Sequence, residues 1–401
     1  MKTELHPEFA SVPAAADARD IVGKCVHCGF CNATCPTYLE LGDERDGPRG
    51  RIYLIRQLLE TGQAGVNTRR HLDRCLTCRA CETTCPSGVE YGRLADFGRE
   101  VLERRTARSM ADRFARRALR LIVPYRRRFE FLLRMGQVLR PILPRTLRGK
   151  VPARQQRLPV ERGTHPRRVI LLDGCAQAAA TPATNDAAAR VLGRLGITAV
   201  RVAGAGCCGA VSYHLSAHRE ARDFMRRNID ALLPAIEDGA ERIVSSASGC
   251  GVLLKDYGGI MRDDPEYAAP AARISALTVD LCELLHGEDL EPLRREGLPP
   301  VALHVPCTLT HGLGLSDPLR DVLARCGLQL TETRDDHLCC GSAGTYSVLQ
   351  PEMSARLLEN KLAALTLESP SCIATANVGC QLHLATRAEV PVRHWIELLD
   401  P

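Results

Sequence analysis

Two short runs of four cysteines, with one spacing and a proline directly after each, limit most strongly what this chain can fold into. They are "CVHCGFCNATCP" at residues 25–36 and "CLTCRACETTCP" at residues 75–86. Two-residue gaps let one loop present three thiolates to one inorganic centre, and in two-cluster ferredoxins the fourth cysteine binds the other cluster. The runs therefore favour iron–sulfur clusters, with Cys35 expected to serve the second centre and Cys85 the first.

Two other cofactors use similar motifs. Zinc accepts four thiolates, but usually from separated CxxC pairs and not from a four-cysteine run before proline, so zinc is kept as the alternative. Attached haem needs histidine directly after CxxC, where this chain has Gly29, Asn32, Arg79 and Glu82. The N-terminus shows no export signal, and 19 cysteines in a reducing compartment indicate metal rather than disulfides.

The second half of the chain is a duplication. Three cysteines recur at an offset of 132 residues and a fourth at 130: Cys175, Cys207, Cys208 and Cys250 in the first copy, and Cys307, Cys339, Cys340 and Cys380 in the second. Each copy reads as strand, helix, strand, which predicts parallel α/β units whose ligand sites gather at the strand C-terminal ends. The shared register predicts a second class of metal site; a cysteine-lined core without metal is the alternative.

Composition divides the chain into four expected segments. Residues 1–103 hold both cysteine runs and helical patterns such as "PRGRIYLIRQLLETG", residues 104–165 form a basic connector, and residues 166–297 and 298–401 are the two copies. The predicted fold class is multidomain α plus α/β. A mainly helical two-cluster ferredoxin-type domain is expected to precede duplicated α/β domains, each with a Cys-Cys-Gly (CCG) motif.

The connector concentrates the positive charge. Residues 104–157 contain 17 lysines and arginines against two acidic residues, whereas the net charge of the whole chain is +6. Apolar stripes share its arginine-rich helices, which favours docking on an anionic membrane face or on an acidic partner; a solvated helix pair packed on its own domain is the alternative. A zinc protein that binds nucleic acid is a weaker rival, because those stripes do not form a stacking platform.

Several other features narrow the function. The chain has no apolar run long enough to span a membrane, so we expect a cytoplasmic protein, with peripheral contact at the cytoplasmic face of the inner membrane as a further hypothesis. It also has no phosphate-binding loop, and its single GxGxxG match runs through Cys207 and Cys208. Electrons are therefore expected from another subunit. Cys282, Cys326 and Cys372 are expected in the core, and the histidines near the motifs, His304 among them, as satisfied polar residues.

Taken together, these motifs resemble those of the iron–sulfur subunits of bacterial glycolate oxidase, also called glycolate dehydrogenase. The resemblance runs over nearly the whole chain through "HLDRCLTCRACETTCPSGVEYG", "GCCGAVSYH", "HLCCGSAGTYSVLQPE" and "TANVGCQLHL". It implies a non-flavin electron-transfer subunit, not catalytic alone, that passes electrons from FAD-binding subunits oxidising glycolate to glyoxylate toward a quinone. It also implies two [4Fe-4S] clusters, ligated by Cys25, Cys28, Cys31, Cys35, Cys75, Cys78, Cys81 and Cys85.

The CCG copies are similar to domains of heterodisulfide reductase and of lactate-utilisation proteins, so a subunit of either kind of complex is the alternative. In those proteins the pattern ends in CxxC, and the first cysteine of that pair is here Ala247 in one copy and Asn377 in the other. Four thiols per copy suffice for a cubane but are one short of the five-cysteine pattern, which leaves open whether these sites bind metal.

Overall fold

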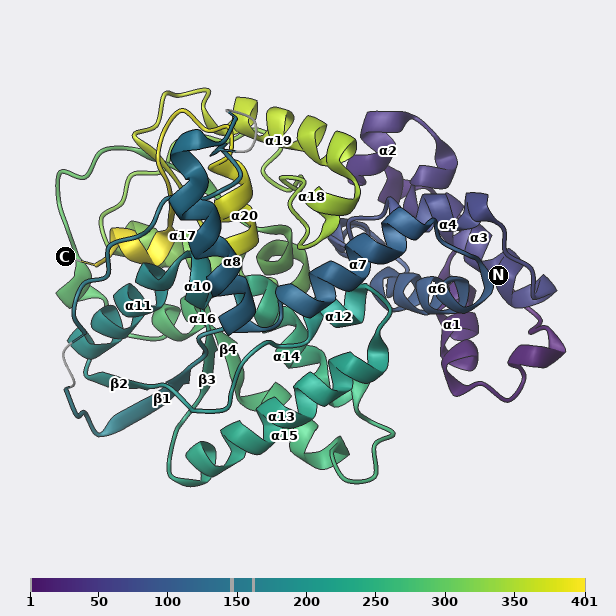
Figure 1. Ribbon diagram of the computed structural model, residues 1–401, viewed down its shortest axis with the longest axis horizontal. Helices are drawn as coiled ribbons and strands as arrows, with labels where there is room; N and C mark the ends of the chain where they lie inside the picture. The colour runs from purple at the N-terminus through teal and green to yellow at the C-terminus, as the bar shows by residue number, and fades with distance from the viewer. Residues whose placement is uncertain (1, 145–147, 161–162, 401) are drawn as a thin grey trace. The chain divides into compact units, whose positions relative to one another are not determined.

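The structure is a computed structural model that describes residues 2–144, 148–160 and 163–400 (Figure 1). The chain forms two compact units. Unit 1 combines Met1–Arg116 with His337–Leu357, and unit 2 combines Arg117–Asp336 with Leu358–Pro401. The loop that contains the second Cys-Cys-Gly motif thus belongs to the same unit as the two N-terminal cysteine runs.

Unit 1 is helical, as predicted. Its elements are η1 (Pro7–Phe9), α1 (Pro13–Lys24), η2 (Phe30–Asn32), α2 (Pro36–Leu41), η3 (Glu44–Asp46), α3 (Pro48–Thr61), α4 (Val66–Asp73), α5 (Ala80–Thr83), α6 (Tyr91–Arg105), α18 (Tyr346–Leu349), the start of α7 (Met110–Ile122) and the first half of α19 (Pro351–Leu365). The pattern at residues 48–62 is confirmed, because α3 ends at Thr61 and Gly62, with φ +70°, is its C-cap. Ile55, Leu58 and Leu72 form the centre of the core.

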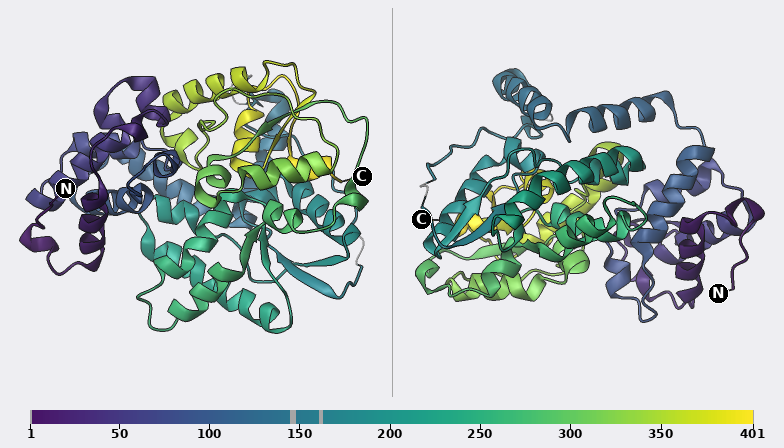
Figure 2. Two further views of the ribbon diagram at one scale, coloured as in Figure 1. Left: turned by 180° about the vertical axis from the view of Figure 1, so that it is seen from behind. Right: turned by 90° about the horizontal axis from the view of Figure 1, so that it is seen from below.

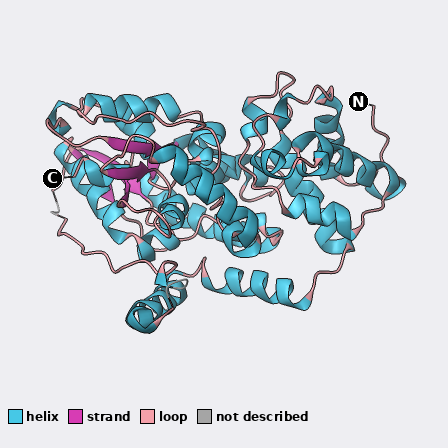
Figure 3. Cartoon of the chain, turned by 90° about the horizontal axis from the view of Figure 1, so that it is seen from above, coloured by secondary structure: helices cyan, strands magenta, loops and turns pink. Residues whose placement is uncertain are grey.

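Unit 2 contains the two predicted parallel sheets, drawn magenta in Figure 3. The first has the order β2-β1-β3-β4, from β1 (Arg167–Leu171), β2 (Ile197–Val200), β3 (Ile243–Ser245) and β4 (Thr278–Asp280). The second has the order β5-β6-β7, from β5 (Val301–His304), β6 (Cys372–Thr375) and β7 (Val392–His394). All pairs of neighbouring strands are parallel. The duplication seen in the sequence is therefore a duplication of α/β units.

Helices cover both faces of the first sheet (Figures 1 and 2). Leu171 and Val244 face a core built with α11 (Pro182–Arg194) and α16 (Leu281–His286). Ile170 and Ile243 face a core built with α13 (His218–Glu237), α14 (Ser248–Ile260) and α15 (Ala268–Leu277), as strand alternation requires. The helices of unit 2 are α8 (Arg126–Leu139), η4 (Arg140–Ile142), α10 (Ala176–Ala180), α11 (Pro182–Arg194), α12 (Ala210–His214), α13 (His218–Glu237), α14 (Ser248–Ile260), α15 (Ala268–Leu277), α16 (Leu281–His286), η5 (Glu291–Leu293), η6 (Thr308–Leu313), α17 (Ser316–Arg325), α20 (Val378–Leu384) and η7 (Trp395–Leu398), with the ends of α7 and α19.

One expected strand is missing. The run "GLQLTET" before the second Cys-Cys-Gly motif predicts a strand, but it forms only an isolated bridge between Leu330 and Val301. The charged stretch that follows, residues 332–336, cannot continue into a buried sheet. The two copies share one hydrophobic core, to which Val169 of the first and Leu303 and Trp395 of the second contribute.

Candidate metal centres

The two N-terminal cysteine runs line two pockets in unit 1, and each pocket draws on both runs. Cys25, Cys28, Cys31 and Cys85 line the first pocket. Cys35, Cys75 and Cys78 line the second, and Cys81 borders both. The structure thus brings the last cysteine of each run to the pocket of the other run, which is the exchange expected for Cys35 and Cys85. With Cys81 counted to the second pocket, where the rest of its run except Cys85 lies, each pocket has four thiols, which matches the one external position of each iron of a cubane cluster.

The two cysteine loops share an unusual backbone conformation at matching positions. His27 and Gly29 in the first loop and Thr77 and Arg79 in the second, at matching positions, have φ of 58°, 85°, 54° and 62°. Residues other than glycine rarely adopt this left-handed conformation, and such strained positions are enriched at active sites and ligand-binding loops. In the second loop the Thr77 N–H also donates to Cys75 Sγ at 3.4 Å. After the first loop, Pro36 begins α2 and turns the chain away from Cys35.

A buried arginine lies against the second pocket. Arg51 is 1% exposed; its guanidinium donates to Thr37 Oγ1 at 3.0 Å and lies 3.9 Å from Cys35 Sγ. Arg99 donates to the backbone oxygen of Cys75 at 2.6 Å. Burial alone raises the pKa of the Cys75 thiol, but the positive charges of Arg51 and Arg99 bring that pKa below its ordinary value.

The first pocket has a different electrostatic environment. Burial raises the pKa of Cys31 to about 11, and the neighbouring thiols add to that rise. Arg49 lines this pocket, but its guanidinium is paired with Glu44 at 2.6 Å. In the second pocket, burial and the neighbouring thiols likewise raise the pKa of Cys81, so the two pockets differ chiefly at Cys75, where Arg51 and Arg99 add positive charge.

The four cysteines of the first CCG copy lie together in unit 2, at the C-terminal end of its sheet. Cys175 follows β1, Cys207 and Cys208 follow β2, and Cys250 lies in α14 after β3. The Cys207 thiol interacts with Cys175 and Cys208, and the Cys208 thiol interacts with Cys250. Contacts from Cys207 and Cys250 hold the pKa of Cys208 well below its usual range. Cys175, Cys208 and Cys250 line one pocket, and Ala247, which stands where the longer pattern has a fifth cysteine, lines it too.

Two buried polar residues that the sequence analysis missed hold the first CCG loop. Asn228 donates to the backbone oxygen of Cys207 at 2.8 Å and accepts from the Gly206 N–H at 2.9 Å. Tyr257 donates to the backbone oxygen of Cys208 at 2.7 Å. Asn228 lies on the buried face of α13, so a polar residue on an apolar helix face was the available signal.

The glycine of each CCG motif serves the backbone fold. Gly209 and Gly341 have φ of +96° and +85°, and each donates its N–H to the thiol two residues earlier at 3.4 Å. A Cβ at Gly209 would lie 3.0 Å from the backbone oxygen of Ala221, and one at Gly341 would lie 2.6 Å from that of Ser354. The glycines thus permit close packing on a following helix, a reason that the sequence alone did not indicate.

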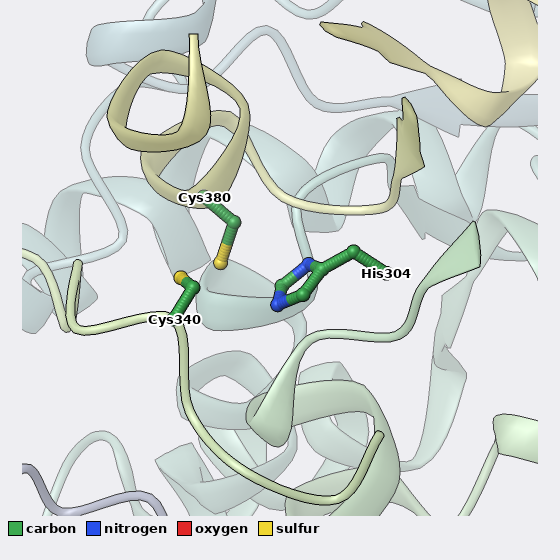
Figure 4. Close-up of side chains that lie close together, drawn as sticks. All are labelled: His304, Cys340 and Cys380. Carbon is green, nitrogen blue, oxygen red and sulfur yellow. The ribbon is translucent and has the colours of Figure 1, made fainter. Parts of the chain in front are cut away.

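In the second copy, Cys307 precedes η6 and Cys380 lies in α20, both in unit 2, whereas Cys339 and Cys340 lie in the loop of unit 1. A ring nitrogen of His304, the last residue of β5, lies within 4.8 Å of Cys380 Sγ (Figure 4). His304 Nδ1 is 2.9 Å from Thr375 Oγ1. Burial, with a smaller contribution from Lys361, lowers the pKa of His304 to about 3, so the ring is neutral.

The three cysteines outside both motifs and His71 have the structural roles expected of them. Cys282, Cys326 and Cys372 are buried in the core of unit 2. His71 is a satisfied polar residue, with Nδ1 2.9 Å from Asp46 Oδ1.

Some arginines of the basic connector form salt bridges with acidic residues of the same chain. Arg108 contacts Asp73 within unit 1, while Arg120 pairs with Glu220 within unit 2. Helix α8 nevertheless leaves large apolar side chains in solvent: Phe131, Leu132, Met135, Val138 and Leu139, with Ile142 beyond its end. Across residues 2–144, 148–160 and 163–400, no helix has the length and apolar content needed to cross a bilayer.

Known proteins match the chain in both halves. A family described as a 4Fe-4S dicluster domain matches residues 21–89, and one described as a cysteine-rich domain matches residues 169–255 and 301–385. The glycolate oxidase iron–sulfur subunit of Escherichia coli is 50% identical over 100% of this chain and 98% of its own length. The probable glycolate oxidase iron–sulfur subunit of Bacillus subtilis is 30% identical over 90% and 87%.

Lactate utilization protein A of Bacillus velezensis is 29% identical but covers only 53% of this chain. The full-length matches thus go to glycolate oxidase subunits, and they agree with the helical unit, the duplicated α/β units and the cysteine pockets. The chain therefore belongs to the family of glycolate oxidase iron–sulfur subunits.

Proposed function

We propose that this chain takes electrons from FAD-binding subunits that oxidise glycolate to glyoxylate and passes them toward a quinone or another respiratory acceptor. The observation that supports this most directly is the pair of pockets in unit 1, each lined by thiols of both cysteine runs. We assign Cys25, Cys28, Cys31 and Cys85 to one [4Fe-4S] cluster and Cys35, Cys75, Cys78 and Cys81 to the other. Such clusters supply one-electron transfer.

The protein's own residues would hold and tune these centres. The left-handed loop positions orient the thiols, the Thr77 N–H stabilises a charged sulfur at Cys75, and the buried guanidinium of Arg51 adds positive charge beside the second pocket. The Arg51 guanidinium is 1% exposed and is therefore closed to an organic acid in solution. We therefore assign glycolate oxidation to the flavin subunits and electron transfer alone to this chain.

The CCG domains would hold additional iron. In the first copy, four thiols converge at the end of a parallel sheet on a loop fixed by Asn228 and Tyr257. Four thiols are enough for a cubane. We extend the proposal to the second copy by the shared register, with Cys307, Cys339, Cys340 and Cys380. The four-part division at residues 103, 165 and 297 is kept as part of this proposal.

Helix α8 of the basic connector supports a proposal about membrane contact. We propose that α8 rests on the anionic cytoplasmic face of the inner membrane as a peripheral contact. Phe131, Met135, Val138 and Ile142 recur at helical spacing, and all four are exposed. The exposed Arg127 beside them matches the charge of anionic lipid, which adds roughly 1 kcal/mol per basic residue. We propose no nucleic-acid partner, because several connector arginines are paired with carboxylates of the chain.

A lactate-oxidising complex is the second candidate, supported by the similarity to lactate utilization protein A over half of this chain. The assembled complex would separate the two. Reduction of an electron-accepting dye that depends on glycolate supports the first function. Reduction that depends only on lactate supports the second.

Iron and acid-labile sulfide analysis of the chain, purified without air, tests the proposal. At least about eight iron and eight sulfide per chain are expected, two cubanes' worth. The C326A variant, which removes a buried core thiol outside both N-terminal runs and both CCG cysteine sets, is the matched control and should keep all of its iron. Zinc without sulfide in a competent complex would contradict the proposal.

A further inference from the structure

The two CCG copies differ at one position three residues before their first cysteine. That position is Leu172 in the first copy and His304 in the second. Leu172 lines the cysteine pocket of its copy, so the matching position faces the thiol site. An apolar side chain thus borders the first site, whereas an imidazole stands at the same place in the second.

His304 is held in a way that leaves one nitrogen free. The side chain is 2% exposed, and Nδ1 is engaged by Thr375 Oγ1 at 2.9 Å. Nε2 is buried and has no hydrogen-bond partner among the described residues. Buried polar atoms are rarely left unpaired, so this nitrogen requires an explanation.

The explanation lies in what His304 faces. A ring nitrogen lies within 4.8 Å of Cys380 Sγ, a thiol of the second copy (Figure 4). A histidine that binds metal through one ring nitrogen characteristically gives the other ring N–H to a fixed acceptor, which sets the tautomer. Thr375 Oγ1 is placed to be that acceptor.

We propose that His304 Nε2 is a ligand of the iron–sulfur centre in the second CCG domain, in the place of the thiol that is missing at Asn377. The second copy would then offer five ligands, one histidine and four cysteines, which is the number in the five-cysteine pattern and one more than a cubane takes, whereas the first copy would offer four thiols alone. This inference rests on the proposed function, because it requires iron in the second copy.

A second buried histidine provides the contrast. His394, also in unit 2 and fully buried, has both ring nitrogens partnered: Nε2 is 2.8 Å from the Ser246 oxygen, and Nδ1 accepts from the Ile396 N–H at 3.3 Å. His394 is therefore a structural residue and a matched control for His304.

Pulsed EPR of the reduced, iron-loaded chain tests the proposal, with natural and with ¹⁵N-labelled histidine. Ligation by imidazole is expected to give a strong hyperfine coupling to ¹⁴N, and a coupling to ¹⁵N should replace it when the histidine is labelled. The coupling should be lost in H304A and in H304C, which can keep the centre with a thiol, and should persist in H394Q. Because the labelled wild-type chain needs no substitution, the test does not depend on variant folding.

The outcomes separate this inference from the proposed function. A chain that has iron beyond about eight atoms but no histidine coupling overturns the ligand assignment. A chain with only about eight iron overturns it too, since the CCG sites would then be empty, yet the two N-terminal clusters would stand. A chain without iron or sulfide overturns the proposed function itself.

Discussion

The Tyr346 hydroxyl donates a hydrogen bond of 2.9 Å to the backbone oxygen of Arg74, the residue directly before Cys75. Within unit 1, this bond fastens the loop of the second CCG motif to the loop of the second cysteine pocket. Burial, with the nearby Cys75, raises the pKa of Tyr346 above its ordinary value, so the phenol remains a donor. The contact joins residues 272 positions apart.

Removing that hydroxyl should loosen the loop. Y346F loses a single hydrogen bond worth about 1 kcal/mol, which corresponds to roughly fivefold faster amide exchange in residues 337–357. Hydrogen–deuterium exchange followed by mass spectrometry measures this. Y53F is the control, because Tyr53 is half exposed, and its loop exchange should match the wild type. Equal protection of the loop in Y346F and wild type would show that the bond is not an anchor.

The proposed exchange of ligands between the two cysteine runs predicts how much iron single and double cysteine variants lose. Cys28 and Cys85 line only the first pocket, and Cys78 lines only the second. C28A and C85A should each remove about four iron, and the double variant no more, because all three lack the same cluster. C28A/C78A should lose about eight. Iron analysis that shows additive loss in C28A/C85A would assign Cys85 to the other centre.

The unequal charge around the two pockets predicts unequal reduction potentials. Arg51 shares the single carboxylate of Asp46 with Arg74, so its positive charge is only partly offset. R51Q should therefore lower the reduction potential of the centre at Cys35 and Cys75 while leaving the other unchanged. At a fixed solution potential, the ratio of reduced to oxidised centre should fall on the order of tenfold, which corresponds to a shift of about 59 mV for one electron.

EPR-monitored redox titration measures the two potentials. R51K, which retains the charge, should move the potential less than R51Q. R69Q removes another buried arginine of unit 1, one whose hydrogen bonds go to the backbone oxygens of Leu102 and Thr106. Equal shifts in both centres, or an equal shift in R69Q, would exclude a local effect of Arg51.

The sequence could predict what depends on local pattern and spacing. Cysteine spacing predicted which thiols line the two N-terminal pockets and which meet in the first CCG copy, and the apolar runs predicted most strands, because both signals are patterns of residue type and spacing. It could not predict Asn228, Tyr257 or Arg51, whose importance comes from burial beside a loop distant in the chain. Treating His304 as a satisfied polar residue was correct for Nδ1 only, since the unpaired Nε2 appears only once the strand and helix are packed.

The buried His394 predicts a dependence of stability on pH. Burial lowers its pKa to about 4 from an ordinary value of 6.5. Its stabilising contribution is therefore complete above pH 6.5 and is lost as the pH falls toward 4, because the unfolded chain takes up the proton first. The slope is about 1.4 kcal/mol per pH unit. Between pH 7 and pH 5.5, the thermal stability of H394Q should depend less steeply on pH than that of the wild type. Equal pH dependence in the two proteins would show that His394 does not cause the effect.

The exposed apolar stripe of α8 predicts binding to anionic vesicles. Phe131 and Val138 are 62% and 78% exposed, and burying either side chain in the headgroup region gains roughly 1 to 2 kcal/mol. The double variant F131S/V138S should therefore bind vesicles of phosphatidylcholine and phosphatidylglycerol at least about tenfold more weakly than the wild type.

The lipid and the control variants decide the nature of that contact. R127Q should weaken binding about fivefold on anionic vesicles and leave binding to pure phosphatidylcholine unchanged, because its contribution is electrostatic. L367S changes a similarly exposed apolar residue elsewhere in unit 2 and should bind as the wild type does. Co-sedimentation measures all four proteins. If F131S/V138S binds vesicles normally but alters the sedimentation coefficient of the free protein, the stripe joins two copies of the chain and the membrane assignment is wrong.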